Sequence, residues 1–216
     1  MGELLIVRHG ETEWSRDGRH TSWTDLPLTD TGERQAVALR PLLGGRRIGL
    51  VLVSPLLRAR HTAELAGLGD AEVEPLLKEW DYGAYEGVTT AEITRERPGW
   101  SLFDDGVPPG PPGHPGESPA EAGARADALL ARLGPVLGAE GDAGDAGDGD
   151  AGDVVLVGHA HFLRVLTARR LGLPPAAGAL FRLDTGTVGA LGTEHGRPAL
   201  TAWNGRVGAG AGPAGA

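Results

Sequence analysis

Short runs of apolar, largely β-branched residues recur along the 216-residue chain. They are Glu3 to Val7, Gly49 to Val53 and Val154 to Val157. Each run is followed by polar residues and then by a helical pattern, which is typical of the buried strands of a parallel sheet. Strands that alternate with helices predict an α/β fold with right-handed crossovers, which place helices on both faces of a mostly parallel central sheet. We therefore expect a three-layer α/β/α sandwich.

Four helices are predicted after or between these runs, and capping residues mark where three of them begin, at Ser54, Thr89 and Ser118. The predicted helices run from Thr29 to Leu43, from Pro55 to about Ala66 after Ser54, briefly after Thr89 with Glu92, and onward from Ser118-Pro119-Ala120-Glu121. The last of these carries apolar residues at helical spacing from Ala126 to Leu137, which indicates a face that packs on the sheet.

Two segments and the tail lack such patterns. Gly106 to Gly116 is dense in Pro and Gly, so it is expected to be an exposed loop. Residues 140–153 repeat Gly, Asp and Ala without the spacing and closing Glu of a calcium-binding EF-hand loop, which favours a solvated, flexible linker. Residues 208–216 are expected to be a disordered tail. We predict a single domain over residues 1–207.

Charge and composition limit the partners. The net charge of −9 and the pI of about 5.2 argue against nucleic acid and anionic membranes. No run approaches the roughly 18 apolar residues of a membrane span, and there is no cysteine. We expect a cytoplasmic protein. An anionic substrate would need a local gathering of Arg, His and backbone N–H groups.

Such a gathering is expected where the predicted strands end. Arg8-His9-Gly10 follows the first strand and Gly158-His159 follows the third. Ligands of open α/β sheets bind at the carboxyl ends of strands, and helix N-termini there favour phosphate. The sheet is therefore predicted to bring the two histidines together, although each alone could be a structural residue.

Two further residues suit phosphoryl chemistry. Arg58 lies in the first turn of its predicted helix, where a guanidinium can grip a phosphate through two N–H donors. Glu79 precedes Trp80 in a segment with aromatic residues. Removal from water and a nearby phosphate would both favour the protonated carboxyl group, which a general acid requires. Taken alone, Glu79 could equally be a surface residue beside core aromatics.

Taken together, these residues resemble the histidine phosphatase superfamily, which is also called the phosphoglycerate-mutase-like family. The resemblance rests on Arg8-His9-Gly10-Glu11-Thr12, Ser54-x-x-x-Arg58-x-x-x-Thr62-Ala63, Glu79-x-x-Tyr82-Gly83 and Gly158-His159. It implies the fold of that family, a phosphohistidine on His9, and stabilisation of the transferring oxygens by Arg8, Arg58 and His159. It also implies that Glu79 acts as acid and then as base, with no metal and no cofactor.

Finer features resemble the acid phosphatase and sugar bisphosphatase branch. They include Arg19-His20-Thr21 and Gly158-His159-Ala160-His161. The mutases carry a basic insertion after the Glu-x-x-Tyr-Gly motif, whereas this chain has only Arg95 and Arg97 there. We therefore expect a phosphomonoesterase that hydrolyses a small phosphorylated metabolite. A cofactor-dependent phosphoglycerate mutase and a sugar bisphosphatase are the alternatives.

The resemblance also suggests substrate contacts, and it suggests a homodimer. The candidate substrate-binding residues are Ser15, Thr21, Ser22, Tyr82, Ala160 and His161. Ser15 replaces the usual Asn of the family, Ser22 stands where Gly is common, and His161 either lines the pocket or faces solvent.

Two other classes of function compete with this reading. The histidines at 9, 20, 159 and 161 could gather as a zinc site. No metalloprotease-like spacing is present, however, and the neighbouring arginines would repel a cation. The chain could also be a non-catalytic phosphate-binding module, although it retains all five polar residues of the catalytic set.

Overall fold

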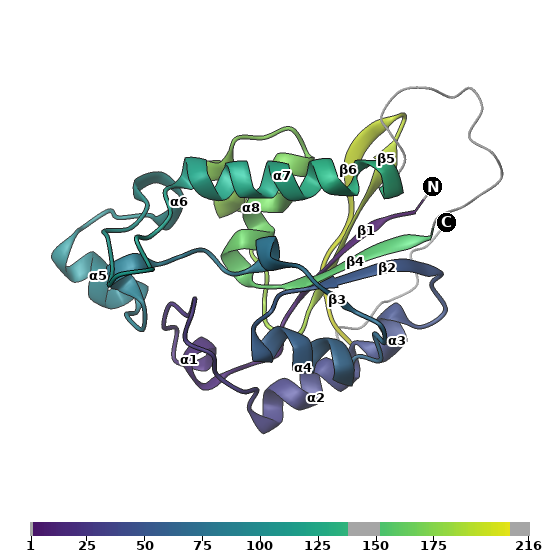
Figure 1. Cartoon of the computed structure of the whole chain (residues 1–216), viewed down its shortest axis with the longest axis horizontal. Helices are drawn as coiled ribbons and strands as arrows, with labels where there is room; N and C mark the ends of the chain where they lie inside the picture. The colour runs from purple at the N-terminus through teal and green to yellow at the C-terminus, as the bar shows by residue number, and fades with distance from the viewer. Residues whose placement is uncertain (1, 138–151, 208–216) are drawn as a thin grey trace, which may run out of the picture.

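The computed structural model describes residues 2–137 and 152–207. A six-stranded sheet in the order β3-β2-β4-β1-β5-β6 forms its centre (Figure 1). The strands are β1 (Leu4–Arg8), β2 (Ile48–Val53), β3 (Glu72–Val73), β4 (Asp153–Gly158), β5 (Val188–Glu194) and β6 (Arg197–Gly205). β1, β2, β3 and β4 are parallel where they pair, and β5 and β6 extend the sheet as antiparallel strands. The prediction of a mostly parallel central sheet is confirmed.

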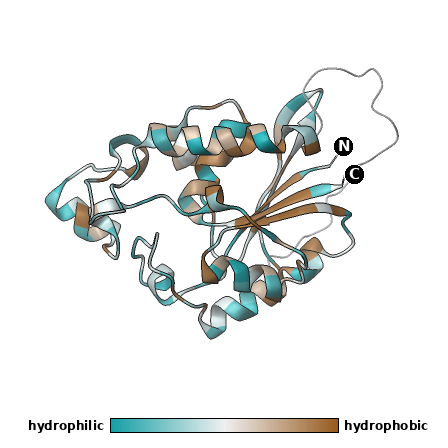
Figure 2. Cartoon of the chain, viewed as in Figure 1, coloured by the Kyte–Doolittle hydropathy of each residue, from teal (hydrophilic) through white to brown (hydrophobic). Residues whose placement is uncertain are grey.

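Alternating side chains of the strands enter two different hydrophobic cores. Leu4 and Ile6 pack with the helices α7 (Pro119–Leu137) and α8 (Ala160–Arg170). Leu5 and Val7 pack on the opposite side with α3 (Arg40–Leu43) and α4 (Leu57–Leu65). Figure 1 shows α7 and α8 on one side of the sheet and α2, α3 and α4 on the other, and Figure 2 shows the hydrophobic strands between these layers. The three layers are those expected from the sequence.

Two of the predicted helix starts are confirmed by reciprocal capping. At α5 (Thr90–Glu96), Glu92 N–H donates to the Thr89 hydroxyl, and the Glu92 carboxylate accepts from Thr89 N–H. Ser118 and Glu121 make the same pair of contacts at the start of α7. Each carboxylate also lies in the first turn, where the helix dipole favours negative charge.

Two other helix predictions are wrong in detail. The single helix predicted from Thr29 to Leu43 is divided into α2 (Asp30–Ala38) and α3, with Leu39 between them. Pro41 explains the division, because proline has no N–H to donate and its ring crowds the carbonyl four residues earlier.

The second correction concerns Ser54. α4 begins at Leu57 and has no side-chain cap from the residue before it. Its first N–H donates instead to the carboxylate of Asp25, from a distant loop, at 2.8 Å. The Ser54 hydroxyl contacts His159 instead, so its role lies in the site described below.

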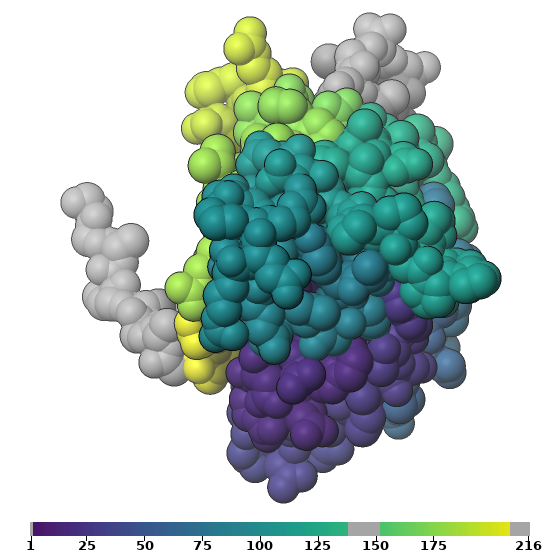
Figure 3. Space-filling view, turned by 90° about the vertical axis from the view of Figure 1, so that its left-hand side faces the viewer, coloured from purple at the N-terminus to yellow at the C-terminus, as the bar shows by residue number. Residues whose placement is uncertain are grey.

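The remaining elements are short. They are α1 (Glu13–Arg16), α6 (Leu102–Asp105) and the 3-10 helices Pro75–Leu77, Gly83–Tyr85 and Pro175–Leu180. Figure 3 faces the end of the molecule where α1 and α5 lie, and it shows the purple N-terminal segment against the teal segment that follows β3.

The Pro- and Gly-rich loop is more closely packed than expected. Gly83, at φ 51°, lies so close to the loop that a Cβ on it would stand 2.1 Å from the Pro108 carbonyl oxygen. Ala84 N–H donates to that same oxygen, and Gly106 is buried. The loop therefore covers the backbone after Tyr82, and only part of it is exposed.

The second low-complexity segment lies mostly outside the described residues, and so does the tail at 208–216. Asp153, expected to end the linker, is instead the first residue of β4, where its carboxylate binds Arg46 and accepts from Glu3 N–H. Within residues 2–137 and 152–207, no helix has the length and apolar character needed to span a membrane.

Candidate active site

The predicted pair of histidines meets at the carboxyl ends of two neighbouring parallel strands. Arg8, at the end of β1, pairs with Gly158 at the end of β4, so His9 and His159 follow at the same edge of the sheet. Their ring centroids lie 5.1 Å apart with the rings tilted by 60°. Both side chains are buried.

His9 is held with one ring nitrogen ready to react. Its Nδ1 lies 2.7 Å from the carbonyl oxygen of Gly10. Since a carbonyl can only accept, Nδ1 carries the proton and Nε2 keeps its lone pair. Gly10 N–H donates to the Thr62 hydroxyl, and a Cβ on Gly10 would lie only 2.3 Å from the carbonyl oxygen of Gly32. The glycine is required by this close approach of two backbones.

Arg8 lies beside His9 with part of its guanidinium group unpartnered. Its Nη1 donates to the Leu183 carbonyl at 2.6 Å. Its Nε is buried and has no hydrogen-bond partner among the described residues. Burial lowers the pKa of His9 well below its usual value, and the positive charges of Arg58 and Arg8 lower it further. The imidazole is therefore neutral, which is the form that can attack phosphorus.

Arg58 is fully buried and is fixed by His159 and by a loop. Its Nε donates to His159 Nδ1 at 3.2 Å, so His159 carries its proton on Nε2, which contacts the Ser54 hydroxyl at 2.7 Å. Burial lowers the pKa of His159 well below its usual value, and the charge of Arg58 adds to this effect. Both ring nitrogens of His159 are engaged with protein groups.

The loop that holds Arg58 is itself held by Glu86. Three loop carbonyls, those of Thr21, Ser22 and Thr24, accept from the Arg58 guanidinium at 3.0 to 3.1 Å. The N–H groups of Ser22 and Thr24 donate to the Glu86 carboxylate at 2.8 to 3.1 Å. Glu86 was not singled out from the sequence. Its position seven residues after Glu79 gave no signal, because the contact joins segments far apart in the chain.

Glu79 is a buried carboxylate at the N-terminus of α8. It accepts N–H bonds from Trp80 and Phe162 at 2.8 Å each and from His161 at 3.1 Å. These three N–H donors fix the carboxylate in place at the start of the helix.

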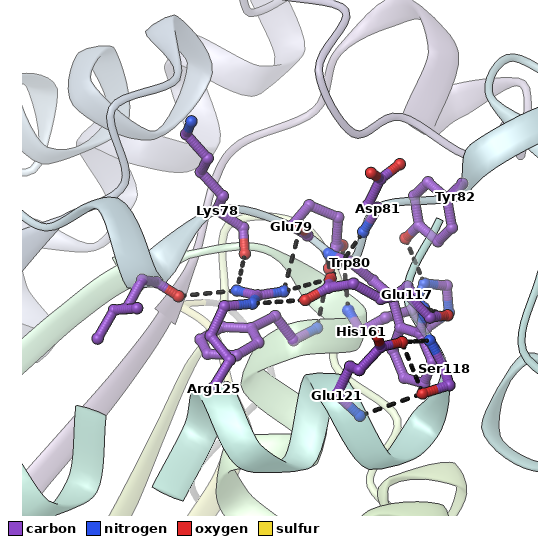
Figure 4. A network of polar contacts seen from close by, with 12 residues as sticks. Lys78, Glu79, Trp80, Asp81, Tyr82, Glu117, Ser118, Glu121, Arg125 and His161 are labelled. Carbon is purple, nitrogen blue, oxygen red and sulfur yellow. Dashed lines mark hydrogen bonds and ion pairs between the residues drawn. The ribbon is translucent and has the colours of Figure 1, made fainter. Parts of the chain in front are cut away.

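A network behind Glu79 fixes the segment on which it lies (Figure 4). Arg125 of α7 donates to the carbonyl oxygens of Leu76 and Lys78 and forms an ion pair with Glu117. Its guanidinium carbon also lies 3.8 Å from the centre of the Phe162 ring. Arg125 therefore joins the segment before Glu79 to the helix whose N-terminus binds the Glu79 carboxylate.

A cavity of about 140 Å³ opens beside these groups. It is lined by Arg8, His9, Ser15, Gly18, Arg19, His20, Thr21, Glu79, Tyr82, Thr90, Ala160 and His161. Arg8 and His9 line it, and the rings of the buried Tyr82 and His20 also belong to its wall. The Tyr82 hydroxyl contacts His161 Nδ1 at 2.6 Å (Figure 4).

The structure places the predicted substrate-binding residues unequally. Thr21, Tyr82, Ala160 and His161 line the cavity with His9. Ser15 also lines it, but its hydroxyl is engaged with the backbone of Thr12 in the cap of α1. Ser22 lines a different cavity of about 420 Å³, on the side of Trp23 and His114.

Comparison with known proteins decides the family. The model of the histidine phosphatase superfamily (branch 1) matches residues 4–206. The chain belongs to the histidine phosphatase superfamily. An acid phosphatase of Mycobacterium tuberculosis is 41% identical over 89% of this chain and 87% of its own length. The sedoheptulose 1,7-bisphosphatase of Saccharomyces cerevisiae is 34% identical over 78% of this chain and 67% of its own length.

A solved structure agrees with these relatives. The product of an open reading frame of Mycobacterium tuberculosis superposes with a TM-score of 0.83 at 39% identity, covering 95% of this chain and 98% of its own. This histidine phosphatase is accordingly a phosphatase hydrolase with a phosphoglycerate-mutase-like fold, as the sequence predicted. Within the described part of the chain, no three His, Cys, Asp or Glu side chains cluster closely enough to hold a metal ion.

Proposed function

We propose that this histidine phosphatase is a metal-independent phosphomonoesterase that forms a phosphohistidine on His9. The observation that carries the proposal is the neutral His9, with Nδ1 bound to the Gly10 carbonyl and Nε2 free to react. Nε2 attacks phosphorus, the bond between phosphorus and the ester oxygen breaks, and the phosphoryl group moves to His9. Water then attacks phosphorus, the bond to Nε2 breaks, and inorganic phosphate leaves.

Arg8 and Arg58 would stabilise the charge of the transferring phosphoryl oxygens. The buried, unpartnered Nε of Arg8 supports this role, because a phosphoryl oxygen would supply the missing acceptor. Arg58 adds a buried positive charge close to both histidines. His159 would contact a phosphoryl oxygen only if Nε2 exchanged the Ser54 hydroxyl for it. Before that exchange, His159 orients Arg58.

Glu79 would move the protons of both steps. It lines the same cavity as His9 and lies at the start of α8. In the first step its protonated carboxyl group would give a proton to the leaving oxygen. In the second step the carboxylate would take a proton from the attacking water. The fixed position of Glu79 supports this role, because a general acid or base must first lie within reach of the proton that it transfers.

The rest of the cavity wall would bind the organic part of the substrate. We assign this contact to Thr21, Tyr82, Ala160 and His161, which line the cavity. Ser15 would contribute little through its hydroxyl, which already caps α1. Ser22 would act through its backbone, by accepting from Arg58.

Hydrolysis is favoured over mutase activity by the placement of the basic residues. A mutase must hold a second phosphate while the first one transfers. Arg95 and Arg97, the cations that follow the Glu-x-x-Tyr-Gly motif, are exposed on and after α5, and neither lines the cavity. A sugar bisphosphatase is the second candidate, because one relative is a sedoheptulose 1,7-bisphosphatase and the exposed Arg19 borders the cavity.

The test is hydrolysis of p-nitrophenyl phosphate from acid to neutral pH in the presence of EDTA. We expect steady turnover that the chelator does not reduce, and a phosphoenzyme trapped by acid quench that is absent from His9→Ala. Loss of turnover in EDTA that added metal restores would refute the metal-independent mechanism. Turnover only with phosphoglycerate and its bisphosphate activator would favour the mutase.

Two coarser predictions remain beside this mechanism. We propose a homodimer and a cytoplasmic location. Light scattering during size-exclusion chromatography tests the first, because a dimer has twice the 22.3 kDa mass of the chain. Cell fractionation tests the second.

A further inference from the structure

The wall of the cavity contains a buried histidine to which no role has yet been given. His20 is 6% exposed and lines the cavity. Its Nδ1 lies 2.7 Å from the Val88 carbonyl oxygen, so Nδ1 donates and Nε2 is an acceptor. No hydrogen bond to this Nε2 occurs among the described residues. An acceptor without a protein partner that can be reached from a cavity suits a ligand group that donates.

The ring of His20 is fixed in place by its neighbours. It packs edge-on against Tyr82 at 4.7 Å and against Trp100 at 5.8 Å between ring centres. His161 stacks on it at 5.9 Å with an angle of 25°. His20 therefore presents its Nε2 lone pair in a defined position.

The side chains that surround His20 in the cavity wall are themselves neutral. Burial lowers the pKa of His20. Burial lowers the pKa of His161 well below its usual value, and the charges of Arg164 and Arg8 lower it further, so both rings are neutral. Tyr82, Thr21 and Thr90 add only hydroxyl groups to this wall. Arg19 is the one cation of the lining besides Arg8, and its exposed guanidinium donates to the Gly87 carbonyl at the rim.

We propose that the leaving group of the substrate is uncharged and rich in hydroxyl groups, as in the monophosphate ester of a sugar or another polyol. This inference rests on the proposed function, since it names the substrate class of the same site. A hydroxyl of the leaving group donates to His20 Nε2, and further hydroxyls contact Tyr82 and His161. An isolated neutral hydrogen bond of this kind contributes about 1 kcal/mol, or roughly fivefold in binding.

A carboxylate or second phosphate in the same place would be disfavoured. It offers only acceptors, so it would face the His20 lone pair with no proton between them and would lose its hydration in a largely buried cavity. A polar site rejects a ligand whose groups leave its own polar atoms unpaired more strongly than an apolar pocket rejects an extra methylene.

The sharpest experiment compares glycerol 3-phosphate with 3-phosphoglycerate. The two esters share a carbon skeleton, and only the second has a carboxylate in place of the terminal hydroxymethyl group. We expect a kcat/KM for glycerol 3-phosphate that is at least about tenfold higher, with p-nitrophenyl phosphate as the reference for turnover. Equal values, or a preference for 3-phosphoglycerate, would overturn the inference while leaving the phosphatase mechanism intact. No turnover of any of the three esters would overturn both proposals.

A variant locates the effect at His20. His20→Phe keeps a ring that can pack against Tyr82 and Trp100 but removes both nitrogens. We expect the ratio of kcat/KM for glycerol 3-phosphate to that for p-nitrophenyl phosphate to fall about fivefold. Only glycerol 3-phosphate has a leaving-group hydroxyl that donates to His20, so only its hydrogen bond is lost. An unchanged ratio in a variant that unfolds cooperatively would contradict the assignment. If the variant does not fold, the comparison of the two esters on the wild-type protein still decides.

Discussion

Two parts of the wall of the catalytic cavity, one around His9 and one around His20, are built in different ways. At the phosphate end, Arg8 and His9 follow directly from β1 and lie beside His159 after β4, so the sheet itself sets their positions. In the part of the wall that we assign to the leaving group, His20 and Tyr82 come from loops, and they are placed by ring packing and by a bond from His20 to a loop carbonyl. The charged Arg8 and the nucleophile belong to the first part, whereas His20, His161 and Tyr82 are neutral and offer acceptors and a hydroxyl group.

This difference matches what is constant and what varies in a phosphatase substrate. Every substrate presents the same phosphoryl group, which requires charge stabilisation in fixed positions. The organic part differs from one substrate to another and must be read by hydrogen bonds. A loop can exchange its side chains without disturbing the sheet, so specificity can change while the chemistry is kept.

The most severe test of the phosphate end is His9→Ala. We expect turnover of p-nitrophenyl phosphate to fall by about 10⁴ or more, because no other group replaces the nucleophile. Steady-state rates and an acid-quench assay for the phosphoenzyme measure the effect. Near-native rates in this variant would show that the covalent mechanism is wrong.

Glu79→Gln separates proton transfer from phosphoryl transfer. We expect glycerol 3-phosphate hydrolysis to fall by roughly 10² to 10⁴. p-Nitrophenyl phosphate should still form the phosphoenzyme, because nitrophenolate leaves without a proton. The second step needs the base, so the phosphoenzyme should accumulate in rapid-quench experiments.

The control for Glu79→Gln is thermal unfolding, because the amide can no longer accept all three N–H groups from Trp80, His161 and Phe162. An equal loss of rate with both substrates in a folded variant would argue against a proton-transfer role.

Glu86→Gln tests whether the loop of residues 21–24 positions Arg58. The amide nitrogen would face a backbone N–H of Ser22 or Thr24, so one contact is lost and the loop carbonyls that hold Arg58 shift. We expect vanadate to bind about tenfold more weakly, which corresponds to the loss of about one hydrogen bond to a charged group. KM should rise more than kcat falls.

Glu121→Gln is the matched control for Glu86→Gln. Glu121 also accepts a backbone N–H, that of Ser118, but at the exposed start of α7. We expect a small loss of stability there and unchanged vanadate binding. Equal vanadate affinities in the two variants would show that Glu86 serves stability alone.

The sequence allowed the phosphate end, around His9, to be predicted more completely than the part of the cavity wall around His20. Arg8, His9 and His159 are adjacent to strands that can be recognised from their apolar runs, and parallel pairing then brings them together. The capping boxes at Thr89 and Ser118 were equally readable, because they depend on residues three positions apart.

Contacts between distant segments could not be predicted in this way. The cap of α4 by Asp25, the bond from His159 to Ser54 and the support of the loop by Glu86 all join segments far apart in the chain. Local patterns do not specify such contacts. The same limit explains why Ser54 was assigned to a helix cap. It also explains why His20 was named in a branch motif and in the alternative zinc site, but not among the candidate substrate-binding residues.

The smallest expected effect concerns pH and stability, and it compares the histidines of both ends. Burial lowers the pKa of His9, His159, His20 and His161 in the folded protein. In the unfolded chain these residues titrate near about 6.5. As the pH falls through that value, the unfolded chain binds protons that the folded protein refuses, so the free energy of unfolding falls. Above about pH 7 these four residues contribute no pH dependence.

Urea unfolding across this pH range measures the effect, and single variants divide it between the two ends. Each histidine that stays neutral in the folded protein adds at most about 1.4 kcal/mol per pH unit to the slope of the free energy of unfolding against pH. His9→Ala and His20→Phe should each make the slope shallower by up to that amount. The larger reduction is expected for His9, because the charges of Arg58 and Arg8 act on it in addition to burial. A slope that only His20→Phe reduces would mean that His9 is readily protonated in the folded protein, and the neutral nucleophile at the phosphate end would then have to be abandoned.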